Sequence, residues 1–476
     1  MTKRNSGLID RRSFLQTVGG ATALAALPAS ASPGEMDSST ARPNVVFFLS
    51  DDHSIEDSGC YGSKVVRTPN IDRIATEGMR FTRAFTPTAM CSPSRSALYT
   101  GLSPHRNGCH MNHGKVKPGT RSIAHYMKDA GYRVVLANKK HIGPATAFPF
   151  EYIGSQGIAP FLQNVGQAPF CLVIASSEPH GPHATGGYKP EEVEVPPYMV
   201  DTPMTRQALA NYYTDIDTLD REVGECLELL EKHNLAENTL FFYGGDHGNG
   251  IFVKWTCYEA GLNVPFIVRW PGRIKAGAVS EAMVSFVDVL PTILDAAGQA
   301  PPASLDGKSF LPVLTGKTDA HRDIIFGAHT THGILSGSIY PVRSVRTATH
   351  KYIRNLYPEG VFENVMTHGL NFKPEEASSE WKSWCRKAKT DSFAAKRVEM
   401  YQRRPAEELY DLRTDPHELS NIASDPANKG ILKKLGKQLD TWMKQQGDEG
   451  LEAERKVKRH PGVDLAKHQK KQKKRG

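Results

Sequence analysis

The chain has 476 residues, of which 39% are apolar and 23% charged, and this composition indicates a soluble globular protein rather than a disordered one. Its length favours two or three domains. The seven cysteines are too few for a disulfide scaffold in a chain of this size, and their spacing selects no pairing. The net charge of +8 resides mainly at the ends, because residues 451–476 carry ten Lys and Arg against three acidic residues.

The N-terminal segment has the features of an export signal. An Arg-Arg-Ser-Phe-Leu sequence at 11–15 precedes a stretch rich in Gly, Ala and Leu that ends in Ala-Ser-Ala at 29–31. This pattern resembles a twin-arginine signal peptide, so we expect cleavage of residues 1–31 and export to the periplasm or the medium. Residues 18–27 are too short and too mildly apolar to span a bilayer, so no stable membrane insertion is expected after cleavage.

The basic C-terminal segment could contact a polyanion such as nucleic acid or a sulfated glycan. Runs of this kind are more often simply solvated. We therefore predict a disordered tail over 451–476 and no nucleic-acid partner.

The apolar pattern predicts strands that alternate with helices. Residues 43–50 form a short, continuous apolar run, as expected for a buried central strand, and an amphipathic helix is expected at 205–235. The alternation fades after about residue 330, so we predict an α/β catalytic domain over 43–330 and a smaller α+β domain over 331–450. Further strands are expected at 132–137, 170–176, 238–243, 264–268, 350–354 and 408–412, and further helices at 68–79, 120–130 and 288–297.

Carboxylates follow two of the expected strands directly. Asp51 and Asp52 come after the first strand, and Asp246 and His247 come after the strand at 238–243. Asp pairs at strand ends are commonly only turn or cap residues. Because open α/β sheets place their sites at the carboxyl ends of strands, two such ends together indicate an oxygen-rich cation site.

The sequence Cys-Ser-Pro-Ser-Arg at 91–95 presents a nucleophile to an anion. The segment should become helical, with Cys91 at or just before the helix N-terminus and Arg95 one turn later on the same face. Free N–H groups, the helix dipole and a planar guanidinium all favour a tetrahedral anion there. The alternative is a small buried cysteine beside a capping serine.

Cys-x-Pro-x-Arg followed by Thr100-Gly101 resembles the signature of type I sulfatases. In that family the cysteine is oxidised to formylglycine, whose hydrate attacks sulfur with one hydroxyl and expels sulfate with the other. The resemblance implies an alkaline-phosphatase-like fold, a formylglycine made from Cys91, and a formylglycine-generating enzyme as maturation partner. It also implies one Ca²⁺ bound by Asp51, Asp52 and Asp246 together with the group at 91. His247 stands where many relatives carry Asn, and we include it in the metal set.

Three further segments match motifs of the family. Asn-Lys-Lys-His-Ile-Gly at 138–143 resembles Gly-Lys-x-His-x-Gly, which implies that Lys139 binds sulfate and that His141 accepts a proton during sulfate release. A basic solvated loop is the alternative there. The Pro-His-Gly-Pro motif implies that His180 serves the leaving group, and Lys254 matches a second sulfate-binding lysine. His183 lines the same pocket or belongs to a surface loop.

Several stretches are similar to one branch of the family, the heparan N-sulfatases (sulfamidases). They surround Lys140, Pro144 and Arg343, and they imply N-sulfated glucosamine of heparan-type glycans as the substrate. Arg343 could pair with a sugar carboxylate or sulfate, or could form a structural salt bridge. The alternatives are an O-sulfatase for another polysaccharide, a phosphoester or phosphonate hydrolase of the same superfamily, and a non-catalytic glycan-binding protein. A phosphoester hydrolase would usually carry ligands for a second metal, which we do not find in the sequence.

Overall fold

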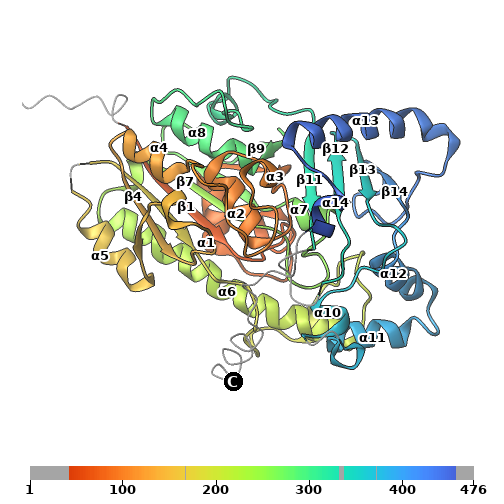
Figure 1. The fold of residues 1–476 in the computed structure, drawn as a ribbon. Coiled ribbons are helices and arrows are strands. Elements are labelled where there is room, and N and C mark those ends of the chain that lie inside the picture. The colour runs from red at the N-terminus through yellow and green to blue at the C-terminus, as the bar shows by residue number, and fades with distance from the viewer. Residues whose placement is uncertain (1–41, 167, 332–336, 371–372, 457–476) are drawn as a thin grey trace, which may run out of the picture. The chain divides into compact units, whose positions relative to one another are not determined.

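The fold is built on an eight-stranded sheet in which five neighbouring strands run parallel (Figure 1). The apolar run after Pro43 forms the central strand β1 (Asn44–Ser50). β8 (Phe266–Arg269) is antiparallel to both of its neighbours, which makes the sheet mixed. Across the sheet the order is β5 (Glu151–Ile153), β4 (Arg133–Asn138), β6 (Phe170–Ala175), β1, β7 (Thr239–Gly245), β8, β2 (Met79–Phe81) and β9 (Ala278–Ser280).

Helices cover both faces of this sheet, because alternate residues of β1 are apolar on both sides. Phe47 packs in one buried cluster with residues of α2, α4 and α8, and Phe48 packs in another with residues of α1, α5 and α6. The strands are therefore buried on both faces, as the unbroken apolar run predicts. The helices of this part are α1 (Pro69–Glu77), α2 (Cys91–Thr100), α3 (Pro104–Asn107), α4 (Ile123–Asp129), α5 (Ile158–Gln163), α6 (Pro203–Lys232), α7 (Glu259–Leu262), α8 (Val289–Ala296) and α9 (Leu311–Leu314).

A second, four-stranded antiparallel sheet forms the C-terminal part (Figure 1). Helix α13 (Lys429–Gln446) packs on it, with the Trp442 ring stacked on Phe326 at a centroid distance of 4.9 Å. Its strands are β11 (Ile325–His329), β12 (Val342–Arg346), β13 (His350–Asn355) and β14 (Glu407–Asp411), accompanied by α10 (Val365–His368), α11 (Ser379–Lys387), α12 (Ser392–Gln402) and α14 (Leu451–Lys456), while β3 (Ala84–Phe85) and β10 (Val284–Ser285) form a separate pair.

This computed structural model describes residues 42–166, 168–331, 337–370 and 373–456. The expected export signal at 1–31 and residues 457–476 of the expected tail lie outside these ranges. Helix α14 covers the first six residues of that tail, so the prediction of disorder is wrong for 451–456. The first strand of the second sheet begins at Ile325, just before the expected boundary.

The predicted strands and helices are present, with ends that shift by a few residues. The long helix begins at Pro203 rather than at 205, because the hydroxyl of Thr202 caps it by accepting from Thr205 N at 3.1 Å. All seven cysteines lie in described residues and are free thiols. Within the described ranges, no helix combines the length and apolar character needed to cross a bilayer.

Candidate active site

The candidate site lies at the edge of the large sheet where parallel strands end side by side. Ser50 and Gly245, the last residues of β1 and β7, are aligned in the register. Asp246 N donates to the Ser50 carbonyl at 3.1 Å, and Asp52 N donates to the Asp246 carboxylate at 3.0 Å. Because parallel strands present their carboxyl ends at one edge, the acidic residues that follow them meet there, as predicted.

Helix α2 brings Cys91 to this edge. Cys91 is the first residue of the helix and is buried, which confirms its predicted position at a helix N-terminus. The Ser94 hydroxyl donates to the Asp246 carbonyl at 2.6 Å and so fixes the first turn of α2 to the end of β7. In this turn Ser92 N donates to Asn112 Oδ1 at 3.3 Å, Ser94 N donates to the Met90 carbonyl at 2.9 Å and Pro93 has no N–H, so the helix dipole rather than a set of free N–H groups favours an anion here.

Four buried side chains are close enough to hold one metal ion. The ligand atoms of Asp51, Cys91, Asp246 and His247 all lie within 4.8 Å of one another. Asp51 Oδ1 is buried and accepts no hydrogen bond from the described residues, which fits an oxygen reserved for a cation. His247 donates from Nδ1 to the Gly248 carbonyl at 2.8 Å, which leaves Nε2 beside Cys91 Sγ at 3.4 Å. Two carboxylates and an imidazole form a donor set suited to a divalent cation.

Cationic side chains balance the carboxylates of this cluster. Arg95 Nη2 lies 3.1 Å from Asp246 Oδ2 and 3.4 Å from Asp51 Oδ1, and Lys139 forms an ion pair with Asp51. Burial would raise the pKa of Asp51, but Lys139 and Arg95 outweigh it and hold that pKa well below its usual value. Burial raises the pKa of Asp246 to about 6, even though His247 and Arg95 act in the opposite direction.

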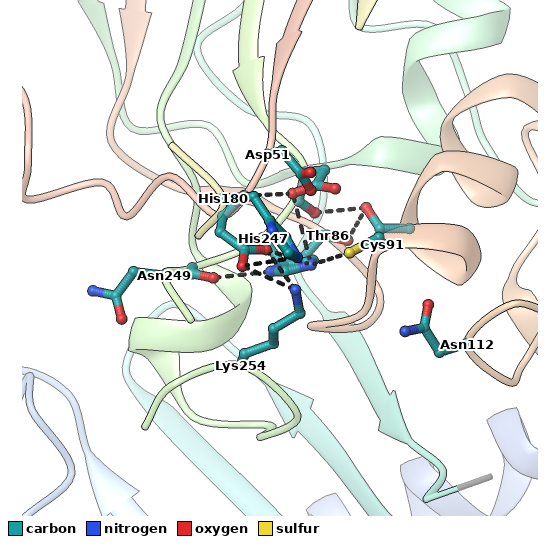
Figure 2. A network of polar contacts seen from close by, with 12 residues as sticks. Asp51, Thr86, Cys91, Asn112, His180, His247, Asn249 and Lys254 are labelled. Carbon is teal, nitrogen blue, oxygen red and sulfur yellow. Dashed lines mark hydrogen bonds and ion pairs between the residues drawn. The ribbon is translucent and has the colours of Figure 1, made fainter. Parts of the chain in front are cut away.

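Lys254 supplies further positive charge to the cluster (Figure 2). Its Nζ lies 2.8 and 2.9 Å from the two carboxylate oxygens of Asp52. Burial would raise the pKa of the Cys91 thiol, but Lys254 and Lys139 outweigh it and lower that pKa to about 6. The field at residue 91 therefore favours an anion, whether it is a thiolate or the oxygens of a bound sulfate.

The last residue of β4 and the loop after it contain left-handed backbone. Asn138 has φ of 67° and His141 has φ of 38°. Asn adopts this conformation more readily than most non-glycine residues, which explains why it can replace the usual glycine of the motif. His141 Nε2 lies 2.8 Å from Nδ1 of His113. Burial, reinforced by Lys139, lowers the pKa of His141 to about 3, so the ring is neutral.

The two histidines expected near the leaving group differ in their surroundings. His180 donates from Nδ1 to the Gly181 carbonyl at 2.7 Å, and its Nε2 lies 3.9 Å from Asp52 Oδ2. Its side chain is 42% exposed, so it lies where the cluster meets solvent. His183 is instead anchored on α6, with Nδ1 2.7 Å from Asp215 Oδ2.

The structure corrects the expectation that Arg343 binds substrate. Its side chain is fully buried and forms an ion pair with Asp448, with N–O distances of 2.5 and 2.8 Å. It also donates to the His329 carbonyl at 2.8 Å. With its guanidinium engaged inside the protein, Arg343 forms the structural salt bridge that was the alternative.

Sequence reasoning missed two residues of the site, Asn112 and His113. Asn112 Oδ1 accepts from Ser92 N at 3.3 Å, in the first turn of α2, and His113 contacts His141. The Asn-His-Gly sequence at 112–114 is typical of a turn, and His113 has φ of 59°. Nothing in that local pattern indicates which loop it contacts.

Comparisons with known proteins agree with this geometry. The sulfatase family profile matches residues 43–159 and 154–299, more than half of the chain. The chain belongs to the sulfatase family. A second profile, described as N-sulphoglucosamine sulphohydrolase, C-terminal, matches residues 245–383 of this sulfatase. An ulvan-active sulfatase of Formosa agariphila is 37% identical over 425 residues, covering 86% of this chain and 81% of the relative.

Two further similarities concern the branch of the sulfatase family and the fold. The human N-sulphoglucosamine sulphohydrolase is 30% identical over 471 residues, covering 84% of this chain and 90% of that protein. A protein solved in complex with its substrate D-glucosamine-2-N,6-O-disulfate superposes with a TM-score of 0.64 at 20% identity, covering 86% of this chain and 99% of the other. The predicted alkaline-phosphatase-like fold is confirmed, and this sulfatase is an enzyme that hydrolyses sulfate esters or sulfamates.

Proposed function

We propose that this sulfatase removes sulfate from a sulfated glycan, with N-sulfated glucosamine of heparan-type chains as the substrate. The observation that carries the sulfatase chemistry is the buried Cys91 at a helix N-terminus, surrounded by Arg95, Lys139 and Lys254. The choice of an N-sulfated substrate is supported by the 30% identity to the human sulphohydrolase and by the match to its C-terminal family profile.

Sulfatases generally depend on formylglycine and a metal ion, and the residues present fit both. We assign Asp51, Asp52, Asp246 and His247 to one Ca²⁺, and Cys91 as the residue converted by a formylglycine-generating enzyme. Asp51 Oδ1, which accepts no hydrogen bond from the described residues, supports the metal assignment. When present, these groups supply a Lewis acid for the sulfate oxygens and a nucleophile that ordinary side chains do not provide.

The protein's own residues bind and orient the sulfate. Arg95 and Lys254 are buried and Lys139 is half-buried, so their charge attracts the sulfate oxygens more strongly than it would in solution. His141 is the neutral imidazole that accepts a proton when sulfate is released.

His180 is assigned to the leaving group. Cleavage of an S–N bond requires a protonated nitrogen, because an amide anion is a far worse leaving group than an alkoxide. The imidazole of His180 is 42% exposed and lies beside Asp52, so it can reach both the substrate and the cluster. We assign the delivery of that proton to His180.

The test offers N-sulfated, 6-O-sulfated and 2-O-sulfated glucosamine-type mono- and disaccharides, and an ulvan fragment, to matured enzyme at equal concentration. Preference for the N-sulfated sugar would support the proposal. Preference for an O-sulfate would agree with the assignment as a sulfatase but would contradict the assignment as a sulfamidase. A phosphonate or phosphate monoester assayed in parallel addresses the phosphoester alternative.

The mass of the tryptic peptide that contains Cys91 is measured on the same preparation. Unmodified cysteine in a fully active preparation would overturn the assignment of formylglycine. Unmodified cysteine in an inactive preparation would instead favour the alternative of a non-catalytic glycan-binding protein. We further propose export by the twin-arginine motif. Sequencing of the mature N-terminus should place cleavage after Ala31.

A further inference from the structure

His113 lies against the site without a role in the chemistry described so far. Its Nδ1 is 2.8 Å from His141 Nε2, and the two ring centroids are 4.5 Å apart. Its backbone N donates to the hydroxyl of Ser92, the residue after Cys91, at 3.2 Å. His113 therefore contacts both the nucleophile helix α2 and the loop that carries His141.

This contact restricts which ring nitrogen of His141 can accept a proton. A neutral imidazole has one nitrogen that donates and one that accepts. Nε2 of His141 is engaged by His113, and Nδ1 is buried with no hydrogen-bond partner among the described residues. If Nε2–H donates to His113, Nδ1 keeps its lone pair and is the nitrogen that can accept a proton.

The loop that carries His141 is joined to the segment that carries His113. His141 lies outside any helix or strand and has left-handed backbone, with φ of 38°. The loop is joined to the His113 segment by Val116 N, which donates to the Gly143 carbonyl at 2.9 Å. The side-chain contact and the backbone contact together hold the two loops as one unit.

We propose that His113 is a positioning residue, which holds the His141 ring in one orientation and one tautomer with Nδ1 as the proton-accepting nitrogen. The inference rests on the role proposed for His141, and it names His113 as the residue that fixes the ring orientation and tautomer for that role.

Two substitutions separate the side-chain contact from backbone strain. The φ of 59° at His113 suits Gly and Asn alike, so neither replacement adds strain. His113→Asn keeps an amide at the position of Nδ1, whereas His113→Gly removes the partner. Lys115→Ala is the matched control, because Lys115 is exposed in the same loop and makes no hydrogen bond or ion pair with the described residues.

We expect His113→Gly to lower kcat by about five- to tenfold with KM within about twofold of wild type, the effect of one lost hydrogen bond to a reacting group. His113→Asn should restore most of the rate, and Lys115→Ala should leave it unchanged. Equal rates in the Gly and Asn variants would overturn the proposal. The assay uses whichever sulfated sugar the wild type turns over fastest, so failure of the N-sulfated substrate does not affect it.

The second readout needs no turnover. Nitrogen NMR of the His141 ring is recorded on protein produced without the maturing enzyme, with the signal assigned by its loss in His141→Asn. Wild type and His113→Asn should show one tautomer, protonated at Nε2, and His113→Gly should show a mixture. A single unchanged tautomer in His113→Gly would overturn the proposal even if the rate falls.

Discussion

Replacement of Arg343 by Met tests whether this residue is structural or binds substrate. Arg343 and Asp448 are both fully buried, and the pair has two N–O contacts, at 2.5 and 2.8 Å. Arg343→Met keeps much of the side-chain volume but leaves the Asp448 carboxylate without its partner inside the protein. Breaking a buried ion pair in this way costs about 3–5 kcal/mol of unfolding free energy.

The structure offers a matched control on the neighbouring strand. Arg354 of β13 lies opposite Arg343 in the register and pairs with Asp440, but these side chains are 25% and 62% exposed. Arg354→Met should therefore cost about 1 kcal/mol or less. The double variant Arg343→Met, Asp448→Asn should recover part of the stability, because no charge remains buried without a partner.

The measurement is urea unfolding followed by circular dichroism, with KM determined for each variant on the preferred sulfated sugar. We expect Arg343→Met to unfold at lower urea concentration and to keep a wild-type KM in the protein that remains folded. A KM at least about tenfold higher, with an unchanged unfolding free energy, would refute the structural role and restore the substrate contact.

Three other perturbations test the site and its support. Lys254→Met should lower kcat by about a hundredfold or more, because it removes a buried cation from the proposed sulfate site; near-normal kcat in steady-state assays would contradict the proposed role. Asp51→Asn should abolish the rise in melting temperature that Ca²⁺ gives the wild type in a thermal shift assay, and a persisting rise would place the ion elsewhere. Burial alone would raise the pKa of Asp288, but the charge of Arg322 outweighs burial and lowers that pKa to about 2. The ionised Asp288 carboxylate therefore stabilises the folded protein at pH values above about 4, which is the pKa of Asp in the unfolded chain. This stabilisation is lost as the pH falls to about 2. The stability difference between wild type and Asp288→Asn in urea unfolding should therefore shrink over that range, and a constant difference would contradict the linkage.

The sequence predicted the central strands and the residues at their ends because both are local patterns. The apolar run before Asp51 and the one before Asp246 each define a buried strand, and parallel topology then brings their ends together. The helix N-terminus at Cys91 was predictable for the same reason. The family resemblance supplied the roles of these residues.

Contacts between loops could not be predicted in this way. Arg343 and Asp448 are 105 positions apart, and His113 and His141 are 28 apart, in segments without apolar periodicity. Their pairing depends on how the connecting segments close over the sheet. The sequence therefore left both possibilities for Arg343 open, and it gave no sign of His113.

The left-handed residues around the site bear on how the enzyme responds to heat. Among the described ranges, eight non-glycine residues have positive φ, and six of them lie in loops or at a strand end that carry or contact the site: Asp52, His113, Asn138, His141, Phe252 and Trp255. Each costs about 1–2 kcal/mol relative to ordinary backbone, so together they approach the net stability of a typical domain. Loops held in this way relax before the sheet that anchors them melts. Activity should therefore disappear at a lower temperature than the far-ultraviolet signal of the sheet, and a more tightly packed core would not extend the enzyme's working range.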